Sequence, residues 1–428
     1  MRSYVANIGA LPRDIRLFLA YNLLANIGFG VFQLIFNLYL VELNLREDYI
    51  GALSAVQTVC MAIAGLTLGR VLGRFGTWRS MLGGVGMLFV VSYAMAFTEN
   101  AIALIMMAGL FGVGLCYLFN ITMPFIIEFA PHTQRALVAS LSFSLISASV
   151  TIGSLVGGFA PRIMQSLLAD GGEAGLVAYR WTLVIGMTVA VAGFVPLLRM
   201  REARRSTRAQ ELARAPIVET PREQRQVKRD MLVFVAAGGL MSLGAGMVIP
   251  FYNVFLTSLG ADSREVGYVF AIGSGAAAIT GLTSPWFANR FGPIRAVALL
   301  RMAMMPFYTL LIFVPGYGLA ILAHAIRQIT INVAWPVDST FIGDILPPRA
   351  RSTVFGWRSG AWNIGSALAA IVAGWTIVRY GYAPTFVSLM VFTTAATVLF
   401  VAYYGRHPRV RDGRVITEVV EVTSHTTP

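Results

Sequence analysis

The chain has 428 residues, of which 57% are hydrophobic and only 12% are charged, and its mean hydropathy is +0.70. A soluble domain cannot bury that much apolar surface, so the composition indicates a protein whose solvent is a lipid bilayer. The formal net charge of +13 could suit a nucleic-acid partner, but its distribution along the chain argues against one.

Long apolar stretches follow one another along the chain, each near the length of about 20 residues that a helix needs to cross a bilayer. A β-barrel would instead show alternating segments of about ten residues. We therefore predict an all-α membrane protein with twelve spans and a retained first helix. The spans are predicted at 17–41, 49–69, 80–98, 100–127, 136–161, 181–198, 231–261, 266–289, 296–316, 317–343, 359–378 and 380–405.

The basic residues lie mainly on one side of this arrangement. If successive loops alternate between the two sides, one side holds 25 of the 33 Lys and Arg residues, and the spans hold three. The other side holds the remaining five, Arg46, Arg162, Arg180, Arg264 and Arg379. The positive-inside rule then places both termini in the cytoplasm of a multi-pass plasma (inner) membrane protein. The net charge is thus explained by topology, and nucleic acid is not an expected partner.

The sequence repeats itself at a constant offset of 216 residues, from the first span to the fifth. Arg74-Phe75-Gly76 returns as Arg290-Phe291-Gly292, for example, and Asn37 is answered by Asn253. Such a register across two halves is the signature of an internal duplication. Further pairs are Gly28/Gly244, Gly30/Gly246, Gly51/Gly267, Arg79/Arg295, Glu128/Asp344, Pro131/Pro347, Arg135/Arg351 and Gly158/Gly374.

The duplication predicts four regions. They are an N-terminal six-helix bundle (1–198), a cytoplasmic linker (199–230), a C-terminal six-helix bundle (231–405) and a cytoplasmic tail (406–428). Thr220-Pro221-Arg222-Glu223 has the pattern of a capping box with proline at the first helical position, which predicts a short helix leading into span 7.

The loop Gly69-Arg-Val-Leu-Gly73-Arg74-Phe-Gly76-Thr-Trp-Arg79 resembles the loop signature of the major facilitator superfamily, although Gly73 replaces the usual aspartate. The acid–proline–arginine turns of both halves are also similar to that family. The resemblance implies a gate on the cytoplasmic side. Its residues would be Arg74, Arg79, Glu128, Arg135, Arg290, Arg295, Asp344 and Arg351. Gly153-Ser154-Leu-Val-Gly157-Gly158 weakly resembles a motif of the drug and metabolite antiporters, and packing between the halves is the alternative explanation.

Four amides in span 1, Asn22, Asn26, Gln33 and Asn37, lie within about 60° of one another on one helical face. Polar residues in a span rarely face lipid, so this face meets either a wet cavity or another helix. Asn120 and Asn253 are further amide candidates for substrate binding.

Span 10 gathers His324, Arg327, Gln328, Trp335 and Asp338 on one face. Arg327 either binds a negatively charged or carbonyl-rich substrate or holds amides such as Asn120 and those of span 1. For Arg301, we predict that its side chain extends to the cytoplasmic edge.

Asp338 and Arg358 lie equally far from the turn between spans 10 and 11, so we predict that they interact. With His324 they are the candidates for coupling to protons. An aromatic cavity lining is expected from Phe36, Tyr117, Tyr252, Trp335 and Trp362, with core packing as the alternative for each.

No phosphate-binding loop, metal-ligand cluster or paired nucleophile and base is evident, so we expect no enzyme, cofactor or metal. We predict a monomeric secondary transporter, surrounded by lipid, that works by alternating access. Its substrate is expected to be a small amphipathic or anionic organic molecule, exported and coupled to protons as an antiporter. Uptake of a nutrient or metabolite, and lipid handling or sensing, are the alternatives.

Overall fold

The computed structural model describes residues 11–130, 135–168, 174–200, 221–281, 283–411 and 414–415. Its first half contains α2 (Arg13–Glu42), α3 (Glu47–Phe75), α4 (Thr77–Phe97), α5 (Ala101–Asn120), α6 (Thr122–Phe129), α7 (Arg135–Leu168), α8 (Ala174–Ala192) and α9 (Phe194–Leu198). Its second half contains α11 (Pro221–Val248), η3 (Ile249–Phe251), α12 (Tyr252–Ser258), α13 (Ser263–Gly281), α14 (Ser284–Phe291), α15 (Pro293–Ala303), α16 (Met305–Phe313), α17 (Tyr317–Ile345), α18 (Pro348–Tyr380) and α19 (Ala383–Tyr404). A two-residue hairpin, β1 (Val410–Arg411) and β2 (Arg414–Val415), follows α19.

The helices account for all twelve predicted spans. Ten are long and apolar enough to cross a membrane by length and composition. The other two are the pair α13 and α14, and α17, which carries Arg327 and Asp338 in its interior. The sequence placed the loop between spans 5 and 6 at 161–180, and this was wrong. Because the residues after Pro161 remain largely apolar, α7 continues to Leu168, and α8 already begins at Ala174.

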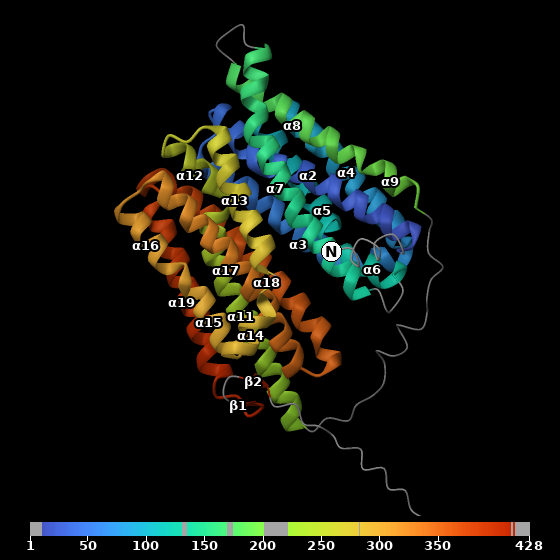
Figure 1. Cartoon of the computed structure of the whole chain (residues 1–428), viewed down its shortest axis with the longest axis vertical. Coiled ribbons are helices and arrows are strands. Elements are labelled where there is room, and N and C mark those ends of the chain that lie inside the picture. Colours follow the sequence, from blue (N-terminus) through green and yellow to red (C-terminus); the bar gives the residue numbers. More distant parts are fainter. Residues whose placement is uncertain are drawn as a thin grey trace, which may run out of the picture.

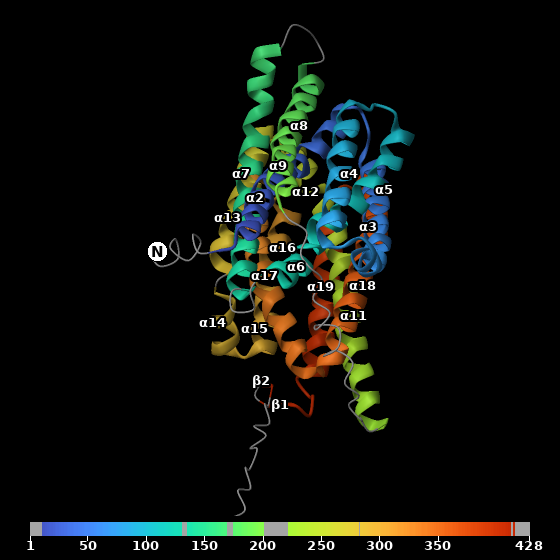
Figure 2. The same ribbon diagram turned by 90° about the vertical axis from the view of Figure 1, so that its right-hand side faces the viewer.

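The two halves lie side by side and meet mainly through two pairs of helices, α3 with α18 and α7 with α13, with smaller contacts of α2 with α12 and α13. Figure 1 shows the first half in blue to green and the second in yellow to red, close together around α7, α12 and α13. From there the ribbons diverge in Figure 1, and Figure 2 shows the same ribbons from the side. The diverging ends carry the arginine-rich loops, among them those with Arg74 and Arg290. We call this side of the molecule the basic face and the other side the opposite face.

Duplicated glycines form the contacts between the halves. A Cβ on Gly51 would lie 2.3 Å from the carbonyl oxygen of Ala370 and 3.4 Å from Gly374, and one on Gly267 would lie 2.7 Å from Gly158. The offset of 216 residues relates Gly51 to Gly267 and Gly158 to Gly374. The two contacts are therefore copies of each other, and only a glycine lets the backbones approach so closely.

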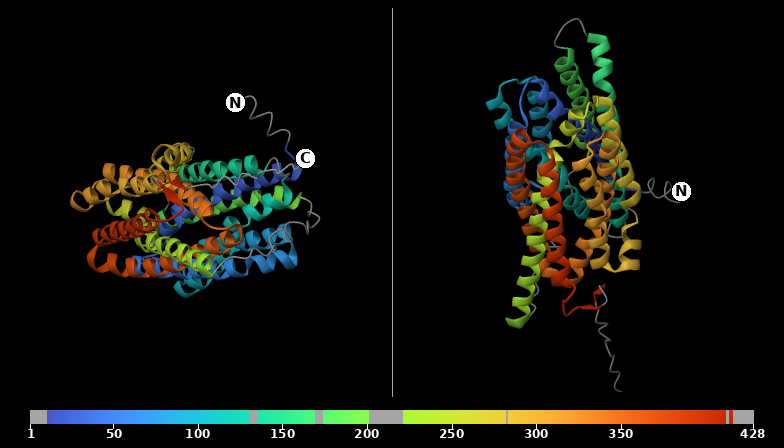
Figure 3. Two further views of the ribbon diagram at one scale, coloured as in Figure 1. Left: turned by 90° about the horizontal axis from the view of Figure 1, so that it is seen from below. Right: turned by 90° about the vertical axis from the view of Figure 1, so that its left-hand side faces the viewer.

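Figure 3 shows the two halves from below and from the left-hand side of Figure 1.

Glycines also end a helix before each duplicated loop of the basic face. Gly76 ends α3 at φ 84° and Gly292 ends α14 at φ 76°, a left-handed conformation that glycine adopts without steric cost.

A buried polar cluster connects the two ends of the second half on the basic face. The carboxylate of Asp230 in α11 accepts hydrogen bonds from Tyr403 (2.7 Å) and Gln226 (3.0 Å), and His407 Nε2 lies 3.2 Å away. On the other side of the ring, His407 Nδ1 accepts a hydrogen bond from the backbone N–H of Arg409. The cluster fixes the chain that follows α19 against the start of α11.

Helix α11 begins at Pro221, as the capping pattern predicts, and runs without a break into span 7. Residues 201–220 of the predicted linker, and 412–413 and 416–428 of the predicted tail, lie outside the described residues, so these two regions stay predictions. Within span 7 the α-helix gives way to the 3₁₀ turn η3 around Pro250, because proline has no N–H to continue the helical bonds.

Candidate substrate cavity

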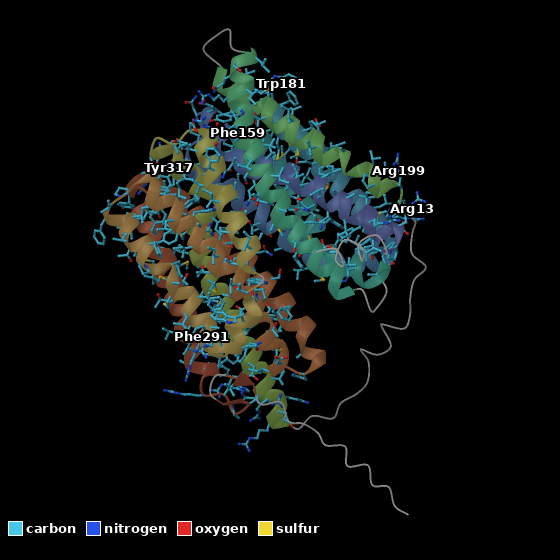
Figure 4. All side chains as sticks on the ribbon, in the orientation of Figure 1. Arg13, Phe159, Trp181, Arg199, Phe291 and Tyr317 are labelled. Carbon is cyan, nitrogen blue, oxygen red and sulfur yellow. The ribbon has the colours of Figure 1, made fainter. Side chains whose placement is uncertain are left out.

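A cavity of about 630 Å³ lies between the two halves. It extends from Asn37 and Asn253, near the opposite face, towards Phe355 and Trp335 on the side of the basic face. In Figure 4 the labelled Arg13, Arg199 and Phe291 mark the basic ends of the two halves. Phe159 and Tyr317 lie towards the opposite face, where the halves meet, and we call this the closed end of the cavity. The predicted substrate residues that line the cavity are Gln33, Asn37, Asn253, His324, Arg327, Gln328 and Trp335.

Both explanations offered for the span 1 amides apply, each to one part of the helix. Asn22 and Asn26 are buried in a helix contact, where Asn22 Nδ2 donates to the carbonyl of Ser142 and Asn26 Nδ2 donates to Asn22. Gln33 and Asn37, further along the helix, line the cavity. Asn120 lies outside the lining and donates to the sulfur of Cys116 within its own helix.

Asn37 and Asn253 form a reciprocal pair of hydrogen bonds across the two halves. Asn37 Nδ2 donates to the carbonyl oxygen of Pro250, and Asn253 Nδ2 donates to that of Leu34 at 2.9 Å. Leu34 and Pro250 are themselves related by the offset of 216 residues. The duplicated asparagines thus hold the halves together at the closed end, a function that the sequence alone did not indicate.

Replacing both Asn37 and Asn253 with alanine should favour opening at the opposite face. Each change removes one hydrogen bond of about 1 kcal/mol, which corresponds to roughly a fivefold shift in population, and about 30-fold for both. Spin labels at the exposed Asp48 and Arg379 would report the change as a population at longer distance in a pulsed dipolar measurement.

Asn363→Ala is the matched control for this experiment. Asn363 also lines the cavity, but its side chain donates to Ser359 within its own helix, so its loss should leave the distance distribution unchanged. An unchanged distribution in the double asparagine variant would contradict the proposed role of the pair.

Arg327 lies against the cavity among uncharged groups. Its Nη2 is 3.4 Å from His324 Nδ1, and its guanidinium carbon is 5.9 Å from the centre of the Tyr252 ring. Within the described residues, no carboxylate is within salt-bridge distance of it, and its Nε has no hydrogen-bond partner. The predicted bonds to Asn120 or to the amides of span 1 are absent from this environment.

Asp338 and Arg358 are in contact, as the sequence predicts. Arg358 donates from Nη1 to Oδ1 at 3.2 Å and from Nη2 to Oδ2 at 3.0 Å, in the two-pronged geometry typical of arginine and carboxylate. Arg358 lines the cavity, whereas Asp338 lies behind it.

The prediction for Arg301 was wrong. Its side chain is buried, and its Nη2 donates to Asp338 Oδ2 at 2.7 Å instead of reaching the membrane edge. Because α15 packs along α17, a position early in span 9 can face the interior of the bundle. One carboxylate therefore serves two arginines, and nothing in the spacing of the sequence indicated the second.

Aromatic side chains make up much of the cavity wall. Trp335 and Trp362 meet edge to face with ring centres 5.7 Å apart, and the guanidinium of Arg358 lies 3.9 Å from the centre of the Trp335 ring. The described lining also contains Phe29, Phe32, Phe36, Phe111, Phe119, Phe270 and Phe355. Of the predicted aromatic residues, Tyr117 packs against Gly84 outside the lining, and Tyr252 is buried beneath Arg327 with its hydroxyl on the carbonyl of Ala320.

The predicted gating residues lie on the basic face, away from the cavity. Glu128 accepts a hydrogen bond from Thr77, and Arg74 lies over the ring of Phe75. Arg79, Arg290, Arg295 and Asp344 are exposed. The side chains of Arg135 and Arg351 lie outside the described residues, and a gating role for this set stays a prediction.

Several lining residues were not expected from the sequence. Ser54, Gln57 and Thr58 of α3 and Ser359 and Asn363 of α18 supply polar groups, and the phenylalanines of α5 supply apolar ones. The three polar residues of α3 are three or four positions apart or adjacent, which is a visible signal. Their helical face, however, could not be assigned to the cavity without knowing which helices are neighbours.

Twelve spans in two repeated halves, around a central cavity whose wall combines aromatic residues with arginines and amides, define a membrane transporter. The family model described as Major Facilitator Superfamily matches residues 18–325 and 234–421. The chain belongs to this family, which makes it a multi-pass membrane protein of the transporter class.

Curated relatives and solved structures are similar at low sequence identity. The uncharacterized MFS-type transporter YxaM of Bacillus subtilis (strain 168) is 22% identical over 45% of this chain, and the match covers only about half, 47%, of that protein. The gentisate transporter of Corynebacterium glutamicum is 23% identical over 78% of this chain and 74% of its own. The cis,cis-muconate transport protein of Acinetobacter baylyi is 24% identical over 32% of this chain and 34% of its own. The crystal structure of the nucleoside transporter NupG superimposes with a TM-score of 0.71 at 14% identity, covering 92% of this chain and 98% of that one.

Proposed function

We propose that this protein transports a small organic anion with a flat, unsaturated body, by alternating access across the membrane. The observation that carries the proposal is Arg327, a guanidinium that lines an aromatic cavity and has only uncharged neighbours. Arginine stays protonated and presents a planar set of donors that matches a carboxylate. A carboxylate on the substrate supplies the partner that the described residues around Arg327 do not.

The cavity wall supports a flat apolar body for the same substrate. Trp335, Trp362 and the phenylalanines offer ring faces and edges for stacking. The cavity volume of about 630 Å³ is within the range of roughly 300–1,000 Å³ for small-molecule sites. A lipid-handling function fits this wall less well, because arginines and amides interrupt its apolar surface.

The names of two relatives agree with this substrate class. Gentisate is an aromatic acid and cis,cis-muconate is an unsaturated dicarboxylic acid, and each is the compound named for a relative of this chain. We infer by the positive-inside rule that the basic face is cytoplasmic and that the cavity opens to the cytoplasm in this conformation. Export and coupling to protons through Asp338, Arg358 or His324 stay predictions.

Ligand binding to the purified protein in detergent tests the substrate class. The acids are benzoate, terephthalate, gentisate and cis,cis-muconate, and the matched controls are benzyl alcohol and benzylamine, which keep the ring without the negative charge. Acids that bind the folded state should raise the thermal unfolding temperature and quench the fluorescence of Trp335 and Trp362. Equal effects from benzylamine or benzyl alcohol would contradict an anion site.

A further inference from the structure

The buried charges of the second half do not balance. In α15, α17 and α18 the buried charged side chains among the described residues are three arginines, Arg301, Arg327 and Arg358, and one aspartate, Asp338. Two of the arginines share that aspartate, at 2.7 and 3.0 Å. Arg327 lies eleven positions before Asp338 in the same helix, or about 16 Å along its axis at a rise of 1.5 Å per residue.

The distance matters because Asp338 cannot compensate Arg327. At about 16 Å and the effective dielectric of about 20 that suits charges in proteins, their attraction is only about 1 kcal/mol. The near neighbours of Arg327 include the ring nitrogen of His324, the face of Tyr252 and the side chain of Tyr308, and none of them is a carboxylate. Arg327 is nevertheless only 4% exposed, although it borders the cavity.

Alternating access requires the cavity to close on both sides during each crossing. While the cavity is open, water within it stabilises the guanidinium, but the closed intermediate removes most of that water. A charge left in a low-dielectric interior without a counter-charge is strongly unfavourable. A bound carboxylate removes this penalty, so the loaded protein can pass through the closed intermediate far more easily than the empty one.

We propose that the protein is an anion exchanger, which crosses between its two conformations only with an organic anion bound on Arg327. This rests on the proposed function, because the exchanged anions occupy the same cavity. Each anion carried in one direction is then matched by one carried back, and the direction of net transport follows the two concentration gradients.

Transport of labelled terephthalate into proteoliposomes tests the exchange. Terephthalate is doubly charged at neutral pH and does not cross the lipid by itself. One set of vesicles contains unlabelled terephthalate and the other contains benzyl alcohol, both in the same chloride-free zwitterionic buffer. Equal potassium on both sides with valinomycin prevents a membrane potential from limiting net uptake.

Initial uptake should be at least ~10-fold faster into the vesicles loaded with terephthalate. Equal rates into the two sets would overturn the exchange proposal. Such a result would leave the proposed function intact if terephthalate still quenches tryptophan fluorescence. Loss of anion binding in the purified protein would instead contradict the proposed function itself.

A carboxylate placed beside Arg327 should abolish the requirement for exchange. His324→Glu puts a negative charge one helical turn from Arg327, where the imidazole now lies 3.4 Å from the guanidinium. The ratio of the two uptake rates should then fall towards one, because the empty protein carries its own counter-charge. His324→Gln is the matched uncharged change and should keep the high ratio, whatever its absolute rate. A ratio that stays high in His324→Glu would contradict the electrostatic cause.

Discussion

Replacing Arg327 with glutamine should weaken the binding of aromatic acids by roughly 10- to 150-fold. Hydrogen bonds to charged groups contribute about 1.5–3 kcal/mol, and each 1.4 kcal/mol is a factor of ten in affinity. The same change should leave the stability of the protein without ligand unchanged or slightly higher, because it removes a buried charge whose described neighbours are uncharged.

The two effects must be measured on one preparation. Fluorescence quenching by benzoate gives the affinity, and thermal unfolding without ligand gives the stability. Arg327→Lys is the matched control, since it keeps the charge and loses the planar set of donors, and an intermediate affinity is expected. Unaltered benzoate binding in Arg327→Gln would place the anion elsewhere in the cavity.

The internal duplication predicted more of the fold than of the site. The offset of 216 residues identified Gly51, Gly158, Gly267 and Gly374 as equivalent pairs, and the structure places them face to face across the two halves. Glycines at such contacts are predictable, because close packing of membrane helices demands small residues. The partner of each glycine was not predictable, since it depends on which helices of the two bundles are neighbours.

At the site, contacts could be predicted within one helix or across a short turn, but not between helices that are distant in the sequence. The polar face of α17 was visible as a helical stripe, and Asp338 and Arg358 could be matched because they flank a single turn. Arg301 lies on α15, which packs against α17 in space. No short turn joins the two helices, so the sequence did not show how deep Arg301 lies in the membrane or that its side chain faces α17. The same limit explains why the bridge that Asn37 and Asn253 form between the two halves was not predicted. Both residues also line the cavity, so substrate binding by them stays a prediction.

Because of Arg301, a change at Asp338 should affect two buried cations at once. Its carboxylate accepts from Arg301 at 2.7 Å and from both terminal nitrogens of Arg358. Asp338→Asn keeps the size of the side chain but leaves two buried guanidinium groups without an anion. Removing one partner of a buried ion pair costs about 3–5 kcal/mol, so the unfolding temperature in detergent should fall well below that of the wild type.

Arg301→Met distinguishes the contributions of Arg301 and Arg358 to stability. It leaves Asp338 and Arg358 as a pair of equal and opposite charges that still share two hydrogen bonds, so it should cost much less than Asp338→Asn. Combined with Asp338→Asn, it should recover part of the lost stability, because one fewer cation is then unpaired. Thermal unfolding of the two single variants and the double variant completes the cycle and gives the coupling energy. Strictly additive losses would contradict the view that a single carboxylate balances both arginines.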